Sequence, residues 1–575
     1  MLKRFLAATL LPFLIAACAA PGAYSAPAAS APQAATEQPA GLVSAADPRA
    51  AEAGAEMLRK GGSATDAAIA TMLALTVVEP QSSGIGGGGF YLHASADGTV
   101  ETIDGRERAP SAAGPDWFTG EDGEPMGFFD AVLSGKSAGV PGNIALAAEA
   151  HERHGKLAWA ELFGPAIALA RDGYVLTERG REFLVRAKNR AAHDPAGAAL
   201  FYDDAGEPVP AGTVVRNPAL AATFEMIAEG GAQAFYSGSF AQGMARKIAE
   251  ATPGEAKMAA GDVTGYEAAE REPVCGQYRI YRICGMGPPS SGATTVFAIL
   301  KQLEPFDLGA LGPQSATFWH LFAESQRLAY ADRELYLADG DFVAVPVEGL
   351  VDPAYLAERG KQISPTGRLA GVQPGKPAGA AVALADGTEP AESGTSHFVA
   401  IDSAGNAVSY TSTIEGSFGS GLVYGGFYLN NELTDFSFAP EKDGRPVANR
   451  VEGAKRPRSS MAPTLVFGPD GRLRLAVGAA GGSTIPVQVA KAIIGVIDFG
   501  LSAQDAIALP TAFSPGDSIA IEQGSSLEAM IPALEALGHS VSARPLPLKA
   551  NAAEWVDGEL VGAVDPRSEG AVSRP

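Results

Sequence analysis

One boundary, at residue 395, constrains the fold of this chain more than any other feature. Residues 360–394 are rich in Pro, Gly and Ala, which is typical of an exposed, irregular linker. The residues behind it read TSHFVAID, and further short runs of strand composition follow, separated by Gly and Asn turns. Helical composition dominates before the linker. We therefore expect a helix-rich part before residue 395 and a strand-rich part after it.

Several individual elements can be placed from their composition. Residues 47–62 and 63–80 predict two helices separated by a Gly-Gly break, with Ser63 as the N-cap of the second. A glycine loop, SSGIGGGG, then leads into the strand FYLHAS. Residues 316–339 predict a long amphipathic helix, and two more helices are expected at 486–499 and 526–538.

The N-terminus predicts export. Residues 1–18 combine Lys3 and Arg4 with an apolar run and small residues, which is typical of a secretory signal. The run ends in IAAC, which resembles a bacterial lipobox whose cysteine, Cys18, becomes lipidated. Residues 19–40 form an Ala/Pro/Ser-rich tether. We expect a periplasmic protein held to the outer membrane by lipid alone; the alternative is an ordinary signal cut near residues 23–26.

The net charge of the chain limits the kinds of molecule it can bind. The chain carries 65 acidic and 43 basic residues, a net charge of −22, which argues against a nucleic-acid partner.

If Arg279 and Ile280 form a two-residue turn, Cys275 lies opposite Cys284 within disulfide reach, and an exported protein would form that bridge. Two buried free thiols are the alternative. The seven histidines are scattered without metal-ligand spacing, so we expect no metal.

A threonine in the sequence GTSHF can become a nucleophile in one way. Its hydroxyl needs a base, and an α-amine with a pKa near 8 can serve if the threonine is the first residue of a chain. The Gly394–Thr395 bond would therefore have to be cut first. A loop before the threonine and a strand behind it suit such a cleavage.

The stretch TSHFVAIDSAGNAVSYTSTIEGSFG resembles the signature of the gamma-glutamyltransferase family of N-terminal nucleophile hydrolases. The resemblance extends from about residue 41 to 569 through further blocks: KGGSATDAA, VEPQSSGIGGGGF, GRERAP, SAGVPG, PPSSGA, LNNELTDFS, KRPRSSMAPT, AAGGSTI and DPRSEG. It implies an α+β fold: a four-layer αββα sandwich of two stacked antiparallel sheets flanked by helices. It also implies a large subunit, 41–394, and a small subunit, 395–575.

The resemblance assigns catalytic roles to four residues. Thr395 matches the nucleophile that becomes a new N-terminus. Thr413 matches the threonine that hydrogen-bonds the nucleophile and helps maturation. Gly481 and Gly482 match the pair whose backbone N–H groups form the oxyanion hole, a task that suits glycine because the backbone must come close to the substrate.

The substrate-binding positions follow in the same way. Arg106 matches the arginine that binds an α-carboxylate, with Arg108 as its competitor, and a guanidinium can do so in bidentate fashion. The acidic residues Glu432 and Asp435 match those that hold an α-ammonium, and Glu415 stands where many members have Asn. The serines that would complete the carboxylate and acyl pocket are Ser459 and Ser460.

These roles imply an autoprocessing gamma-glutamyltransferase and glutathione hydrolase. It would pass the γ-glutamyl group of glutathione or similar compounds to water, amino acids or short peptides through a Thr395 acyl-enzyme, without a cofactor. Its two processed subunits would stay together as a heterodimer.

Four other interpretations remain to be compared. Residues 84–89 fit GxGxxG, but a strand follows them where a dinucleotide site needs a helix. Residues 135–139 fit GxSxG, which would make Ser137 the nucleophile of an α/β-hydrolase. A cephalosporin or glutaryl acylase of the same fold would share Thr395 and differ in the acyl pocket; residues 437–454, the family's variable lid region, leave that preference open. An inert exported lipoprotein is the non-enzymatic alternative.

Overall fold

The computed structural model describes residues 41–120, 122–380, 384–385 and 394–575. The expected signal, the tether, Cys18 and most of the linker's last part lie outside these residues. The described chain is a single compact unit. No helix among these residues is long and apolar enough to cross a membrane.

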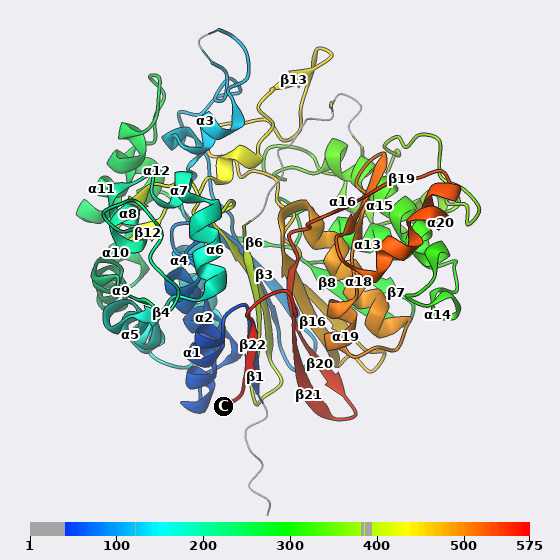
Figure 1. The fold of residues 1–575 in the computed structure, drawn as a ribbon, viewed down its shortest axis with the longest axis horizontal. Coiled ribbons are helices and arrows are strands. Elements are labelled where there is room, and N and C mark those ends of the chain that lie inside the picture. Colours follow the sequence, from blue (N-terminus) through cyan, green and yellow to red (C-terminus); the bar gives the residue numbers. More distant parts are fainter. Residues whose placement is uncertain (1–40, 121, 381–383, 386–393) are drawn as a thin grey trace, which may run out of the picture. The chain divides into compact units, whose positions relative to one another are not determined.

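Two antiparallel sheets form the centre of the molecule (Figure 1). The first has seven strands, in the spatial order β22 (Ala571–Ser573), β1 (Leu42–Ala45), β9 (Ser396–Ile401), β10 (Ala407–Thr413), β2 (Gly88–Ala94), β3 (Val100–Gly105) and β6 (Ala269–Arg271). The second has six, in the order β21 (Glu559–Val564), β20 (Lys549–Val556), β16 (Leu473–Ala480), β15 (Thr464–Phe467), β8 (Tyr281–Gly285) and β7 (Val274–Tyr278). The sheets stack through β9 and β10 against β16 and β20.

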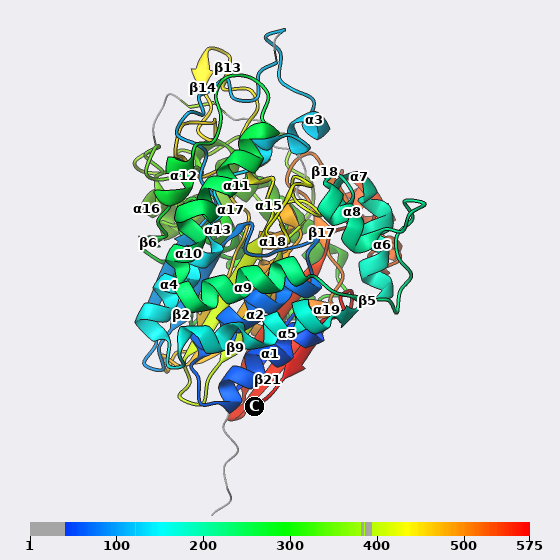
Figure 2. The same cartoon turned by 90° about the vertical axis from the view of Figure 1, so that its left-hand side faces the viewer.

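Helices cover the outer face of each sheet, which completes four layers (Figures 1 and 2). Against the seven-stranded sheet lie α1 (Pro48–Arg59), α2 (Ala64–Val78) and α4 (Asn143–His154), with α5 (Gly164–Asp172), α9 (Pro218–Gly230), α10 (Ala232–Tyr236) and α11 (Gly238–Glu250) around them. Against the six-stranded sheet lie α13 (Gly292–Leu303), α18 (Ile485–Ile497) and α19 (Ala503–Ala508), with α15 (Ala316–Tyr336) packed on α13. The expected αββα sandwich is confirmed.

Helix α2 shows how the sequence builds one of these layers. Every residue of it is buried, and its small Ala and Thr side chains let it fit between the sheet and the outer helices. Ser63 is its N-cap, as expected: its side chain accepts from the backbone of Asp66, whose carboxylate accepts from the backbone of Ser63 in return.

The strands do not divide at residue 395 as the composition suggested. Strands β1, β2, β3 and β6 precede it and share a sheet with β9 and β10, in which β1 pairs with β9 and β2 with β10, while β7 and β8 join the second sheet. Strand β1 has only four residues, too few for alternation to show in the sequence. Both sheets therefore interleave the two parts of the chain, and a cut before Thr395 would leave them joined by shared strand pairing and a shared core.

The expected hairpin carries the two remaining cysteines. Cys275 on β7 pairs with Cys284 on β8, Arg279 and Ile280 form the turn, and a disulfide joins the cysteines across a Cα–Cα distance of 4.1 Å. The last expected helix is shorter than the sequence suggested: a 3-10 turn over Ser526–Met530 precedes α20 (Ile531–Ala536).

Candidate active site

Thr395 lies at the buried start of a central strand. It immediately precedes β9 and is 6% exposed. Its backbone N–H donates to the carbonyl of Ser82 at 2.9 Å, and its hydroxyl donates to that of Thr413 at 3.0 Å. Its φ of 103° is in the left-handed region, which costs a non-glycine residue about 1–3 kcal/mol. The hydroxyl is thus oriented beside a strained backbone.

Thr413 connects the candidate nucleophile to Glu415, one of the residues predicted to bind substrate. It is the last residue of β10, the strand next to β9. Its hydroxyl oxygen also accepts the backbone N–H of Glu415 at 2.8 Å. Glu415 itself has a φ of 70° and accepts a hydrogen bond from the Asn431 side chain. One hydroxyl therefore fixes both Thr395 and the turn that carries Glu415.

Two glycines, Gly394 and Gly87, allow the backbone to approach the carbonyl groups of Glu415 and Thr413 closely. A Cβ added to Gly394 would lie 1.7 Å from the Glu415 carbonyl oxygen, and one added to Gly87 would lie 2.0 Å from that of Thr413. Residues 84–89, which match GxGxxG formally, therefore press against the end of β10 and lead into strand β2. This loop supports Thr413 and is not a dinucleotide site.

Arg106 lies in the centre of a buried group of carboxylates. Its guanidinium forms ion pairs with Glu432 and Asp435 and also donates to the carbonyl oxygens of Pro457, at 3.2 Å, and Arg458, at 2.7 Å. All of the charged side chains are buried. A substrate carboxylate at Arg106 would share the guanidinium with these acids, so the assignment of Arg106 to the α-carboxylate stays a prediction. Its competitor, Arg108, instead donates to the carbonyl of Ala454.

Burial raises the pKa of three acids in this group. It raises the pKa of Glu107 to about 7, with Arg106 opposing the shift. It also raises the pKa of Glu432, which Glu107 and Glu415 raise further by charge repulsion. The pKa of Glu415 is raised by burial too, although Arg190 opposes the rise. Four carboxyl groups thus lie near two guanidinium groups, and a cationic ligand would favour the ionised form of these acids.

Residues 457–460 run past Arg106 and carry the two candidate serines. Ser459 donates its backbone N–H to the carbonyl of Pro289 at 3.0 Å, and its own carbonyl accepts from Ser291. The Ser460 hydroxyl accepts from Arg333 on α15 at 2.7 Å. Both serines are buried.

Gly481 and Gly482 follow the end of strand β16. Their φ values of 125° and 59° are in the region that favours glycine. A Cβ on Gly481 would lie 1.8 Å from the Pro547 carbonyl oxygen. Helix α18 begins three residues after Gly482, so its N-terminal end faces the same turn, a favourable place for negative charge.

A buried ion pair connects that turn to Thr395. Lys549 pairs with Ala480 across the sheet, and its ammonium contacts the Glu79 carboxylate at 2.9 Å and the Ser396 hydroxyl at 3.3 Å. The Ser396 hydroxyl donates to Glu79 at 2.7 Å. Burial lowers the pKa of Lys549, and Glu79 opposes that shift. Both charged groups therefore contact Ser396, the residue that follows the candidate nucleophile.

The sequence did not identify several of these residues. Glu107 was signalled only by its place beside Arg106 in GRERAP, and Asn431 by its place in LNNELTDF. Ser82 was signalled in the same way by VEPQSSGIGGGGF, whereas Arg333 and Lys549 gave no signal, because the fold alone brings them to the site from distant parts of the chain.

The GxSxG interpretation is wrong. Ser137 is fully buried in a 3-10 turn, where its hydroxyl donates to the carbonyls of Val132 and Ser134. A helix, α3 (Phe128–Val132), precedes it where a nucleophile elbow needs a strand.

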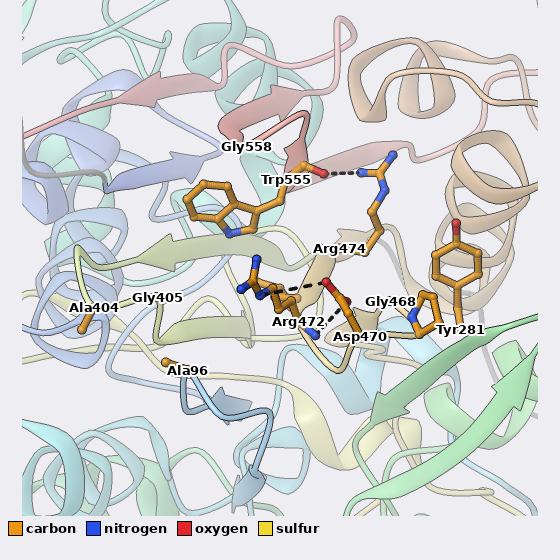
Figure 3. A pocket seen from close by; sticks show the side chains of 12 residues that line it. Ala96, Tyr281, Ala404, Gly405, Gly468, Asp470, Arg472, Arg474, Trp555 and Gly558 are labelled. Atoms are coloured by element: carbon orange, nitrogen blue, oxygen red, sulfur yellow. Dashed lines mark hydrogen bonds and ion pairs between the residues drawn. The ribbon is translucent and has the colours of Figure 1, made fainter.

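An open cavity of about 720 Å³ lies at the opposite end of β9 from Thr395 (Figure 3). Turns line it, including those at Ala404–Gly405 and Gly468–Arg472, together with Tyr281 and Trp555. Arg474 donates to the carbonyl of Trp555 at its edge. None of the candidate active-site residues lines this cavity, which is separate from the candidate site.

Comparisons with known proteins agree with this geometry. The gamma-glutamyltranspeptidase family model matches residues 50–574. The chain is 35% identical to the glutathione hydrolase proenzyme of Escherichia coli K12, over 92% of this chain and 90% of that protein. It is also 35% identical to the acylase ACY 1 proenzyme of Pseudomonas sp. V22, over 92% of each. The crystal structure of a cephalosporin acylase from Bacillus halodurans superposes with a TM-score of 0.80 at 26% identity, covering 93% of this chain and 96% of that one.

Proposed function

The chain belongs to the gamma-glutamyltranspeptidase family, and from this we propose that it is a self-processing enzyme that cleaves γ-glutamyl amides such as glutathione. It transfers the γ-glutamyl group to water, to amino acids or to short peptides. The observation that carries the proposal is the alignment of the Thr395 hydroxyl by Thr413, next to a buried group of carboxylates around an arginine.

Processing begins at the bond before Thr395. The Thr395 hydroxyl attacks the Gly394 carbonyl carbon, the C–N bond breaks as the nitrogen takes up a proton, and an ester remains. Water then releases the Gly394 carboxylate and restores the hydroxyl. Cleavage also relieves the strained φ of Thr395, because that torsion no longer exists once Thr395 is an N-terminus.

The freed α-amine then serves as the base for its own hydroxyl. In the uncut chain the Thr395 nitrogen donates to the Ser82 carbonyl, and the same contact would hold the new amine in place. The hydroxyl attacks the γ-carbonyl of the substrate, and its proton passes to the amine and on to the leaving amino group. We expect the N–H groups of Gly481 and Gly482 to stabilise the oxyanion. Water or an acceptor amine then removes the acyl group from Thr395.

The acyl pocket favours a γ-glutamyl group over a glutaryl group. The two acyl groups share a terminal carboxylate and differ in the α-ammonium of glutamate. Four buried carboxyl groups, Glu107, Glu415, Glu432 and Asp435, lie around Arg106 and outnumber the neighbouring guanidinium groups. An α-ammonium would favour the ionised form of these groups and pair with it, and a glutaryl group has no positive charge to do so.

The subunit boundary and the cellular location belong to the same proposal. We infer that residues 41–394 and 395–575 become the large and small subunits, and that the shared sheets hold them together as a heterodimer. The signal at residues 1–18 supports export to the periplasm, and IAAC supports a lipid anchor at Cys18. Mass spectrometry of the mature N-terminus tests the anchor.

The function is tested with matched chromogenic substrates. Purified enzyme should release p-nitroaniline from γ-glutamyl-p-nitroanilide much faster than from glutaryl-p-nitroanilide, and glycylglycine should increase the γ-glutamyl rate. Arg106→Lys should raise KM for the γ-glutamyl substrate, because a lysine cannot make the forked contacts. A preference for the glutaryl substrate would instead identify an acylase.

A further inference from the structure

Three side chains from separate elements meet on the outer face of the seven-stranded sheet. His93 on β2 and Glu101 on β3 are direct partners across the strand pair, and His154 is the last residue of α4. The Glu101 Oε2 atom lies 2.7 Å from His154 Nε2 and 4.0 Å from His93 Nδ1. All three atoms lie within 4.8 Å of one another. The scattered histidine positions in the sequence gave no sign of this group.

One ring nitrogen of the group has no hydrogen-bond partner. His93 is 4% exposed, and its Nδ1 atom is buried without a partner, whereas His154 Nε2 contacts the Glu101 carboxylate. A buried polar nitrogen left unpaired costs about 1–3 kcal/mol, so such groups are almost always satisfied. A single cation between the rings and the carboxylate would give His93 Nδ1 a partner and would also bind His154 and Glu101.

The charges near the group are compatible with a cation. The Glu101 carboxylate, in contact with His154 and 4.0 Å from His93, supplies a negative charge to the group. The neighbouring Arg153 is paired with Glu149 and Glu270, so its charge is already compensated.

We propose that His93, Glu101 and His154 bind one divalent transition-metal ion, with Zn²⁺ as the best match, and that water completes the coordination. Two imidazoles and a carboxylate form a common zinc ligand set. Metal–ligand distances of about 2.0–2.2 Å place the donor atoms of a tetrahedral site about 3.3 Å apart. The separations of 2.7 and 4.0 Å lie on either side of that value.

Binding requires one small rearrangement. The His93 and His154 rings are stacked, with centroids 3.7 Å apart and planes at 12°, so their lone pairs do not converge on one point. His154 is the residue that must rotate. It is the last residue of its helix and its side chain is 19% exposed, so it is less confined than the buried His93.

The site would be structural and not catalytic. His93 lies toward the far end of β2, whose first residue, Gly88, pairs with Thr413 at the candidate active site. The ion would join the end of α4 to β2 and β3. Metal should therefore raise stability and leave turnover of γ-glutamyl-p-nitroanilide unchanged.

The experiment is a titration of untagged, chelator-treated protein with Zn²⁺, followed by calorimetry, and with Co²⁺, followed by visible absorption. We expect one equivalent of each ion to bind, absorption bands typical of low-coordinate Co²⁺, and a higher Tm in Zn²⁺. Glu101→Gln and His154→Gln should each weaken affinity about 100-fold, since even the loss of a group that supports a ligand costs 10–100-fold. Glu149→Gln, on the same helix and outside the cluster, is the matched control and should bind as the unmodified chain does.

Two results would overturn the proposal. One is the absence of saturable Zn²⁺ binding at concentrations up to about 100 µM, well above what a folded site of this kind needs. The other is stoichiometric binding that survives in both Glu101→Gln and His154→Gln, which would place the ion elsewhere. Both replaced side chains are partly exposed, so these variants should fold, and circular dichroism checks that they do.

Discussion

Replacing Thr413 by valine tests the link between the nucleophile and its surroundings. The Thr413 hydroxyl accepts from Thr395 at 3.0 Å and from the Glu415 backbone at 2.8 Å. Valine keeps the shape and removes both contacts. The buried Glu415 N–H cannot rotate to another partner, so the variant should lose about 1–3 kcal/mol of stability. Loss of the bond that orients Thr395 should cost about 1–2 kcal/mol at the transition state, which slows processing about 5–30-fold.

The rate can be measured by cell-free synthesis followed by electrophoresis of timed samples. Thr413→Ser keeps the hydroxyl and should process close to the normal rate. Ser409→Ala is the control for general destabilisation, because it lies on the same strand and leaves the buried Thr464 N–H unpaired without touching Thr395. If Thr413→Val processed as fast as Ser409→Ala, the hydroxyl contact would have no part in maturation.

Three further expectations follow from the site. Gly481→Ala should lower kcat by about 100-fold or more, because the new Cβ would lie 1.8 Å from the Pro547 oxygen and displace an oxyanion donor; an unchanged kcat would remove Gly481 from the site. Burial raises the pKa of Glu107 from 4.5 to about 7, so its contribution to the free energy of unfolding is full below pH 4.5 and is lost as the pH rises through 7. Glu107→Gln should therefore flatten the pH dependence of the free energy of urea unfolding in this range. The same pH dependence in the variant and the unmodified chain would contradict the raised pKa of Glu107. Lys549→Met should destabilise a Thr395→Ala background by about 3–5 kcal/mol by leaving Glu79 unpaired, and adding Glu79→Gln should recover much of the loss; no recovery in urea denaturation would count against the ion pair.

The sequence predicted those parts of the fold that depend on local patterns. The capping residue Ser63, the long helix α15, the disulfide hairpin and strands β9 and β10 each carry a turn, cap or periodic signal within a few residues. Strands β1 and β22, with four and three residues, carry none; β1 forms on the edge of β9, and β22 forms on the edge of β1.

In the candidate site too, some residues carry a local sequence signal and others are brought together only by the fold. Thr395, Thr413 and Arg106 lie in recognisable motifs, and the structure joins Thr395 to Thr413 by a hydrogen bond. The ion pairs of Arg106 with Glu432 and Asp435 could not be foreseen, because motif positions do not say which side chains bind each other in the absence of a ligand. Lys549 reaches Glu79 across 470 residues, and the His93, Glu101 and His154 group depends on a helix returning to a strand pair. Such groupings depend on tertiary packing.

The most direct test is the intact mass of the purified, active protein, combined with N-terminal sequencing of its fragments. We expect two chains that separate under denaturing conditions, the smaller one beginning with Thr395, and a single uncut chain without activity for Thr395→Ala. An active preparation that consists of one unbroken polypeptide would contradict the central claim, because the Thr395 nitrogen would then still be an amide and could not act as the base.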